Sequence, residues 1–331
     1  MTAEAGLTTR DHHGPVLVTG AAGFAGSHLV EVLSDTPDLV CWSREAPAPD
    51  LVPSARWQEI DLLDRERVRD AVAALRPAQV YHLAGVPHVG SSWDATTPTL
   101  AGNVLATHYL FDAMRRAGVR ARVLVTASAT VYAPSDQPLA EDGPIAPGSP
   151  YGLSKLAQEM RSLRGIAEDG LDVIVVRAFN HTGPRQTPAF AAPSFARQIA
   201  LMERGALPPV LRAGNLAPRR DLSDVRDVVR AYVALMERGA SGRVYNVASG
   251  VGRPIGDILD ALISRARVAV TVETDLSLLR PHDTAALVGD CRRLQRDTGW
   301  SPQIPFEKML DDLLEYWRLR AQGPNDSGLR A

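Results

Sequence analysis

The chain has 331 residues, of which 45% are hydrophobic and 22% are charged, ordinary proportions for a globular enzyme with a sizeable core. A net charge of −2 gives no overall basic field for nucleic acid or anionic lipid, and no apolar run approaches the length of a membrane span. The two cysteines, Cys41 and Cys291, form neither a disulfide framework nor a metal site, so the composition predicts a cytoplasmic protein without a bound metal.

Short β-branched segments alternate with amphipathic helical segments through the first half of the chain. Strands are expected at residues 16–19, 39–42, 57–60, 79–83, 122–126 and 172–177. Helices are expected at residues 24–33, roughly 99–117, and 151–168. This alternation predicts an α/β fold with a Rossmann-type, doubly wound parallel sheet.

After residue 180 proline and glycine interrupt the pattern. The expected elements are helices at 193–204 and 224–238, a strand at 243–247 that returns to the first sheet, a strand at 268–273, and further helices up to residue 320. We therefore expect a smaller, discontinuous α/β substrate-binding cap beside the first domain. The predicted domains are an NAD(P)-binding domain at 15–180 plus about 222–250, a cap at 181–221 plus 251–321, and disordered tails at 1–14 and 322–331.

A glycine-rich turn directly follows the first expected strand. Gly20, Gly23 and Gly26 are spaced Gly-x-x-Gly-x-x-Gly, and Phe24 and Ala25 begin the first helix. Glycines in such a turn let the backbone approach a pyrophosphate, which then lies at the helix N-terminus. The placement between an apolar strand and an amphipathic helix predicts a dinucleotide site.

The end of the second strand is where an acidic residue usually binds the adenosine ribose. Here Ser43 and Arg44 occupy that place, and this pair could hold a 2′-phosphate, so NADP(H) is favoured, with NAD(H) as the alternative. Asp61, followed by Leu62, comes after the third strand. Asp61 could hold the adenine amino group or cap the next helix.

Three residues predict the chemistry. Tyr151 and Lys155 are four residues apart on an expected helix and therefore share a face. The chain has 36 lysines and arginines, and only two of them are lysines. One of the two is Lys155, at a position where a compact charge, which arginine does not provide, is needed beside a phenol. Ser128 follows the fifth strand, and such strand ends point into the ligand crevice of an open α/β sheet.

These motifs, together with residues 82–85 (His-Leu-Ala-Gly) after the fourth strand, resemble the extended short-chain dehydrogenase/reductases. Members act on nucleotide-activated sugars as reductases, epimerases, dehydratases or decarboxylases. Residues 177–184 and 196–200 are similar to the GDP-mannose 4,6-dehydratases and the GDP-4-keto-6-deoxy-mannose reductases.

The resemblance implies further site residues and a dimer. The implied cofactor-binding residues also include Leu83, Ala84 and Gly85. The implied substrate-binding residues are Ser92, Ser128, Asn180, Arg220 and Arg280. The helices at 99–117 and 151–168 match those that form a homodimer interface in the family. His181 stays open, either as a substrate contact or as a loop histidine.

In the 4,6-dehydratases, the residues after the catalytic Ser or Thr supply an acid and a base. Here those positions hold Ala129 and Thr130, which disfavours dehydration. We therefore expect a reductase of a nucleotide-activated 4-keto-6-deoxy-hexose, with a hexose 4-epimerase that keeps NAD bound as the alternative. A non-catalytic dinucleotide-binding regulator would be expected to lack Tyr151 or Lys155.

Overall fold

The structure is a computed structural model that describes residues 14–45, 51–87, 89–279 and 284–322. The predicted tails, 1–14 and 322–331, therefore lie almost wholly outside the described residues. Among the helices described, none combines the length and the apolar content that crossing a bilayer requires.

The first half of the chain builds most of a parallel sheet of seven strands. Its strands, in spatial order, are β3 (Arg56–Glu59), β2 (Leu39–Ser43), β1 (Val16–Thr19), β4 (Gln79–His82), β5 (Arg122–Ser128), β6 (Asp172–Ala178) and β10 (Val244–Val247). All six pairings are parallel, and β10 returns from late in the chain to pair with β6. The predicted Rossmann-type sheet is confirmed, including the returning strand.

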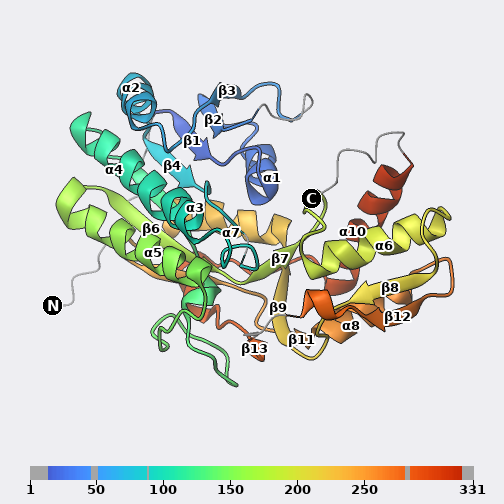
Figure 1. Cartoon of the computed structure of the whole chain (residues 1–331). Helices are drawn as coiled ribbons and strands as arrows, with labels where there is room; N and C mark the ends of the chain where they lie inside the picture. The colour runs from blue at the N-terminus through green and yellow to red at the C-terminus, as the bar shows by residue number, and fades with distance from the viewer. Residues whose placement is uncertain (1–13, 46–50, 88, 280–283, 323–331) are drawn as a thin grey trace.

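Helices cover both faces of this sheet (Figure 1). The helices on one face are α2 (Arg65–Leu75), α4 (Ala106–Arg116) and α5 (Pro150–Asp169). Those on the other face are α1 (Phe24–Val32), α7 (Val225–Arg238) and α9 (Arg292–Thr298). In β6, Val173 packs in the core beneath the first set of helices and Ile174 in the core beneath the second. Burial on both faces explains why the strands are continuously apolar.

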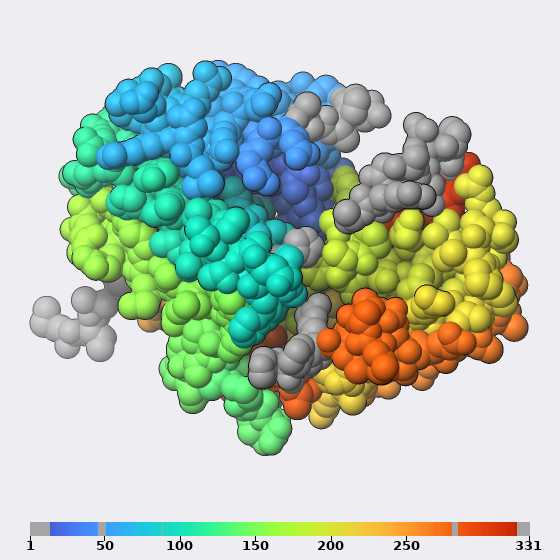
Figure 2. Space-filling model, viewed as in Figure 1, coloured from blue at the N-terminus to red at the C-terminus, as the bar shows by residue number. Residues whose placement is uncertain are grey.

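A second unit has its own apolar core and lies at the right of Figure 1. Its elements are α6 (Ala191–Glu203), β8 (Val210–Ala213), α8 (Ile255–Ile263), β12 (Thr271–Thr274) and α10 (Phe306–Ala321). A small sheet adjoins it, formed by β7 (Asn180–Thr182), β9 (Arg219–Asp224), β11 (Gly252–Pro254) and β13 (Ala286–Leu287). Figure 2 shows the two units meeting across the middle of the molecule. The predicted domain boundaries stay a prediction. Leu294 of α9, which falls within the predicted cap, packs in the core of the first unit.

The helical segment expected at about 99–117 is longer and irregular. It consists of α3 (Thr96–Leu100), a π-turn η1 (Ala101–Leu105) and α4. The π-turn carries the buried side chain of Asn103, whose Oδ1 accepts from the N–H of Val86 (2.8 Å). Such turns often occur at functional sites. Two short 3₁₀ turns are η2 (Ala129–Val131) and η3 (Leu276–Leu278).

Candidate active site

A tight glycine turn joins β1 to α1. Gly20 has a φ of +69°, and a Cβ there would lie 2.7 Å from the backbone nitrogen of Ala84. A Cβ on Gly26 would lie 2.1 Å from the carbonyl oxygen of Gly20, so glycine is required at both positions. Gly23, the N-cap of α1, has no side chain to occupy the free N–H groups of the first helical turn. The turn therefore presents a helix N-terminus that suits a phosphate.

The end of β2 lies beside this turn, because the N–H of Ala21 donates to the carbonyl oxygen of Trp42 (3.1 Å). Ser43 ends the strand, and its hydroxyl donates to the carbonyl oxygen of Glu45. Arg44 is exposed. Both residues thus lie at the edge where an adenosine ribose is held in this class of fold, and their role in cofactor choice stays a prediction.

Asp61 and Leu62 follow β3. The carboxylate of Asp61 accepts from the N–H of Leu63 (2.9 Å) in a local turn. Asp64, and not Asp61, caps α2 by accepting from the N–H of Arg67 (3.0 Å). The helix-capping alternative for Asp61 is therefore wrong. Leu62 is buried in the core, and contact of either residue with an adenine stays a prediction.

Leu83, Ala84 and Gly85 continue β4 past its last paired residue. The N–H of Ala84 donates to Oγ1 of Thr19 at the end of β1 (3.3 Å). A Cβ on Gly85 would lie 3.5 Å from Nζ of Lys155. The same Cβ would lie 2.5 Å from Oδ1 of Asn103, so glycine at position 85 lets this backbone pass close to Asn103.

Ser128, Tyr151 and Lys155 meet at the carboxyl end of the sheet. Ser128 is the last residue of β5. Helix α5 begins at Pro150, with the hydroxyl of Ser149 as its cap, so Tyr151 lies in the first turn and Lys155 one turn later. The Tyr151 hydroxyl is hydrogen-bonded to Ser128, and Nζ of Lys155 lies 6.0 Å from the centre of the Tyr151 ring. The structure thus brings all three predicted catalytic residues together.

Burial governs the protonation of this cluster. It raises the pKa of Tyr151 to about 12, against a hydrogen bond from Ser128 that lowers it. It also lowers the pKa of Lys155 to about 7, because the ammonium loses its hydration. Tyr151 is therefore protonated at neutral pH, as a proton donor must be.

The predicted substrate residues occupy different environments. Asn180 begins β7 directly after β6, the strand paired to β5, and it is exposed. Arg220 lies on β9, and its Nη1 donates to the carbonyl oxygen of Thr284 (2.7 Å). Arg280 lies outside the described residues. Contacts of these three residues with a substrate stay predictions.

Ser92 is buried beneath the start of α5. Its hydroxyl donates to the carbonyl oxygen of Val89 (2.6 Å) and accepts from the N–H of Tyr151 (3.2 Å). In this arrangement Ser92 holds the first turn of the helix that carries Tyr151 and Lys155. Its predicted contact with substrate stays untested.

His181 packs against the helix of the glycine turn. Its ring stacks on Phe24 with 5.7 Å between centroids, and its Nδ1 is 3.0 Å from the carbonyl oxygen of Phe179. Burial lowers the pKa of His181. Of the two roles open for His181, these contacts favour that of a packed histidine, which the structure places on β7 and not in a loop.

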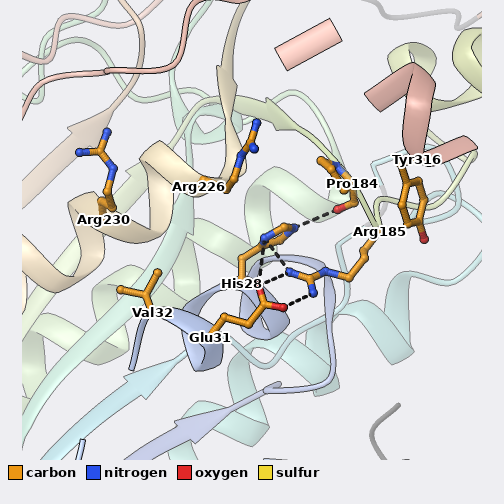
Figure 3. Close-up of a pocket in the computed structure, with 8 residues that line it drawn as sticks. All are labelled: His28, Glu31, Val32, Pro184, Arg185, Arg226, Arg230 and Tyr316. Atoms are coloured by element: carbon orange, nitrogen blue, oxygen red, sulfur yellow. Dashed lines mark hydrogen bonds and ion pairs between the residues drawn. The ribbon is translucent and has the colours of Figure 1, made fainter. Parts of the chain in front are cut away.

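A cavity of about 580 Å³ is lined by side chains of α1, α7 and α10 and by the segment at Pro184 and Arg185 (Figure 3). It is lined by His28, Glu31, Val32, Pro184, Arg185, Arg226, Arg230 and Tyr316. Figure 3 shows Arg185 turned toward Glu31 and His28, and Arg185 forms a two-point ion pair with Glu31. Arg226 and Arg230 are paired with Asp224 and Asp227, respectively. Since each guanidinium already has a carboxylate partner, this cavity lacks the uncompensated positive charge that an anion would require.

Several buried polar residues around Lys155 were not expected from the sequence. They are Thr19, Asn103, Thr107 and Gln158, with His82 noted only as part of a motif. Gln158 lies three residues after Lys155 on α5, a helical spacing that could have indicated a contact. The others come from distant parts of the chain and carry no such signal.

The Rossmann-type sheet, the glycine turn and the Ser–Tyr–Lys cluster together define an extended short-chain dehydrogenase/reductase. The sequence matches the GDP-mannose 4,6 dehydratase family over residues 17–313. The chain therefore belongs to this family, which confirms the resemblance expected from its motifs.

Three matches, one in sequence and two to solved structures, illustrate the similar proteins. The chain is 34% identical over 312 residues to the GDP-6-deoxy-D-mannose reductase of Pseudomonas aeruginosa, covering 93% of this chain and 98% of the relative. The structure of RMD from Pseudomonas aeruginosa complexed with NADPH matches with a TM-score of 0.82 at 33% identity, covering 93% and 99% of the two chains. The UDP-glucose 4-epimerase of Thermus thermophilus, complexed with NAD, matches with a TM-score of 0.82 at 29% identity, covering 92% and 99%.

Proposed function

We propose that this protein is an NAD(P)H-dependent reductase of a nucleotide-activated 4-keto-6-deoxy-hexose, of the GDP-4-keto-6-deoxy-mannose type, in deoxysugar biosynthesis. The cluster of Ser128, Tyr151 and Lys155 carries the proposal, because it places a protonated phenol beside a hydroxyl and an ammonium. The identity of 34% to the Pseudomonas aeruginosa reductase, over nearly the full length of both chains, supports this choice of substrate.

The roles of the three residues follow from their surroundings. When bound, the reduced nicotinamide supplies the hydride that the carbonyl carbon of the sugar accepts. Tyr151 donates a proton to the carbonyl oxygen. The oxygen of Ser128 accepts from the N–H (3.2 Å) and the hydroxyl (3.0 Å) of Thr130, so its own proton is directed at the Tyr151 oxygen and can turn to the same carbonyl oxygen when a substrate binds. The positive charge of Lys155 stabilises the phenolate that forms on Tyr151 when its proton has been donated.

The positions that serve dehydration do not fit that reaction here. Ala129 is buried and has no group that transfers a proton. The hydroxyl of Thr130 donates to Ser128. Although the family is named for a dehydratase, we therefore propose that this member does not expel the C6 hydroxyl.

A hexose 4-epimerase is the second candidate. Residues 128–132, Ser-Ala-Thr-Val-Tyr, resemble the corresponding segment of UDP-galactose 4-epimerases, and the Thermus thermophilus epimerase matches this chain along most of its length. An epimerase oxidises and then reduces one substrate, so it would retain NAD through purification. A non-catalytic regulator ranks below both, because Tyr151 and Lys155 are present and assembled.

A nicotinamide dinucleotide is the proposed cofactor, since similar proteins bind NADPH or NAD. We favour NADP(H) over NAD(H) because Ser43 and Arg44 stand where an acidic residue would repel a 2′-phosphate. The residues proposed to hold it are Gly20, Gly23, Phe24, Ala25, Ser43, Arg44, Asp61, Leu62, Leu83, Ala84, Gly85, Tyr151 and Lys155.

The test is nicotinamide absorbance after mixing the purified protein with GDP-4-keto-6-deoxy-mannose. We expect oxidation of NADPH, faster than that of NADH at equal concentrations. A parallel reaction with dTDP-4-keto-6-deoxy-glucose identifies the nucleotide. Oxidation with neither sugar, in a protein that purifies with NAD, would replace the reductase by the epimerase.

We also propose a homodimer formed through α4 and α5. Leu153 and Met160 are exposed and lie seven residues apart on one face of α5, and Leu105 in the adjoining π-turn is exposed as well. We expect light scattering to give twice the chain mass for the wild type. Met160→Glu should lower the dimer fraction, whereas Leu319→Glu, at an exposed position on α10, should leave it unchanged. A monomeric wild type would refute the dimer.

The proposed location is the cytoplasm. Cys41 and Cys291 are both buried and unpaired, as expected for a reducing compartment. Burial raises the pKa of Cys291 to about 11, which keeps its thiol protonated and unreactive at neutral pH.

A further inference from the structure

The ammonium group of Lys155 is held by two acceptors of the protein itself. Its Nζ donates to the carbonyl oxygen of Thr126 on β5 (2.8 Å) and to Oε1 of Gln158 on α5 (2.9 Å). Lys155 is 4% exposed and Gln158 is fully buried, so water does not replace these contacts. Of the two acceptors, only Gln158 is a side chain and can be changed by substitution.

The orientation of the Gln158 amide is determined by Thr107. The hydroxyl of Thr107 donates to the carbonyl oxygen of Asn103 (2.7 Å), so its oxygen must accept from other groups. Nε2 of Gln158 is one of these donors (2.9 Å). The amide nitrogen is therefore committed to Thr107, and the amide oxygen is left facing Lys155.

The same chain of hydrogen bonds continues to the glycine turn. Because the Thr107 oxygen is an acceptor, Nε2 of His82 (2.8 Å) must carry the proton, which leaves Nδ1 to accept from the hydroxyl of Thr19 (2.8 Å). Burial, and next the charge of Lys155, lower the pKa of His82 to about 3, so the ring is neutral. The described residues of this network are all buried, and each hydrogen bond in it pairs one donor with one acceptor.

We propose that Gln158 is a positioning residue that keeps the Lys155 ammonium charged and directed at the catalytic site, with Thr107 and His82 holding its amide in place. The inference rests on the proposed function, since it assigns Lys155 the catalytic charge. Gln158 contacts the reaction only through Lys155. Two of the three N–H groups of the ammonium are thereby used by the protein, and the third remains for a cofactor or substrate oxygen.

Two substitutions of Gln158 should change the pKa of Lys155 in opposite directions. A hydrogen bond to the charged form of a buried group favours that form, so Gln158→Leu should lower the pKa of Lys155 by about one pH unit. Gln158→Glu places a carboxylate at the same distance and should raise it by about one to two pH units. The other ionisable groups facing Lys155 are Tyr151 and His82, and neither is altered by these variants.

The composition of the chain makes a direct measurement practical. Lys155 and Lys308 are the only lysines in the sequence, so lysine-selective ¹³C labelling gives two side-chain signals in the full-length protein. Lys308 is largely exposed on α10, where it pairs with Asp312, and its signal serves as an internal reference for folding. In an NMR titration, we expect the Lys155 signal to titrate near pH 7 in the wild type, with the two Gln158 variants displaced on either side of it.

Ser162→Ala is the matched control. The hydroxyl of Ser162 is buried on the same helix and donates to the backbone carbonyl of Gln158 (2.6 Å), without contacting Lys155. Its removal should leave the Lys155 titration unchanged. Identical Lys155 titrations in the wild type and in Gln158→Leu would overturn the proposal. If Gln158→Leu does not fold, an unchanged titration in Gln158→Glu would do the same.

The NMR result does not depend on turnover, so it separates this proposal from the proposed reductase activity. If the wild type reduces no 4-keto sugar while the Gln158 variants displace the Lys155 titration as expected, the reductase assignment fails and the positioning role stands. Where turnover is present, the alkaline limb of the kcat–pH profile should move toward lower pH in Gln158→Leu and toward higher pH in Gln158→Glu.

Discussion

Tyr151→Phe is expected to lower kcat for reduction of the 4-keto sugar by about 10²–10⁴-fold, because the carbonyl oxygen then loses its proton donor. The variant removes only the hydroxyl that is hydrogen-bonded to Ser128 and keeps the aromatic ring, so the fold should be retained. The affinity for the nicotinamide cofactor, measured by fluorescence titration, should stay within a few-fold of the wild type. The measurement is steady-state nicotinamide absorbance with the wild type and the variant at equal concentrations.

Tyr316→Phe provides the control for loss of a phenol. Tyr316 lies on α10 in the second unit, and its hydroxyl accepts from Arg320 (3.0 Å). This variant should keep wild-type kcat. Turnover of Tyr151→Phe within tenfold of the wild type would remove Tyr151 from its catalytic role.

The largest effect on stability is expected from breaking the buried ion pair between Arg177 and Glu159. Two hydrogen bonds join these side chains, Nε to Oε2 (2.9 Å) and Nη2 to Oε1 (2.6 Å), and the side chains are 6% and 5% exposed. Glu159→Ala leaves an uncompensated guanidinium in the core. We expect the free energy of unfolding to fall by about 3–5 kcal/mol.

The consequence reaches the active site because Glu159 belongs to α5, the helix that carries Tyr151 and Lys155. Arg177 lies on β6, so its ion pair with Glu159 ties this helix to the sheet, and Arg177 also donates to the carbonyl oxygen of Glu141 (2.9 Å). Urea unfolding followed by circular dichroism measures the loss. Because α5 carries Tyr151 and Lys155, the urea midpoint of Glu159→Ala should be lower than that of the wild type in the presence of cofactor as well.

An exposed ion pair on the same helix gives the control. Arg164 and Glu168 are paired at a spacing of four residues, with side chains 71% and 44% exposed. Glu168→Ala should cost less than about 1 kcal/mol, because solvent screens the pair. Equal losses from Glu159→Ala and Glu168→Ala would show that burial of the Arg177 pair does not matter. A double variant, Glu159→Leu with Arg177→Met, should recover most of the lost stability.

Local patterns predicted the main sheet and the residues that meet in the cluster of Ser128, Tyr151 and Lys155. The apolar segments of β1 and β6 are strands buried on both faces, and Pro150 with Ser149 marks the start of α5. Tyr151 and Lys155 share a face because the helical repeat brings residues four apart together.

The small sheet was not predicted, because its strands have no apolar alternation. Strand β9 reads Arg-Arg-Asp-Leu-Ser-Asp, a sequence typical of an exposed loop. It is ordered by Asp221, whose buried carboxylate accepts from the N–H groups of Ser249 (2.7 Å), Gly250 (2.9 Å) and Gly289 (3.2 Å). Burial raises the pKa of Asp221 even though these hydrogen bonds lower it. The partners lie 28 to 68 residues away, so no local pattern indicates them.

The class of fold, the glycine turn and the identities of Ser128, Tyr151 and Lys155 could all be predicted from the chain alone, because each depends on short-range periodicity or on a strand end. How Lys155 is held depends on tertiary structure. Gln158 is its neighbour on α5, but the Thr107 and His82 that orient Gln158 come from α4 and β4. Hydrogen bonds between distant segments form when the core closes, and their geometry is not encoded in the spacing of residues along the chain.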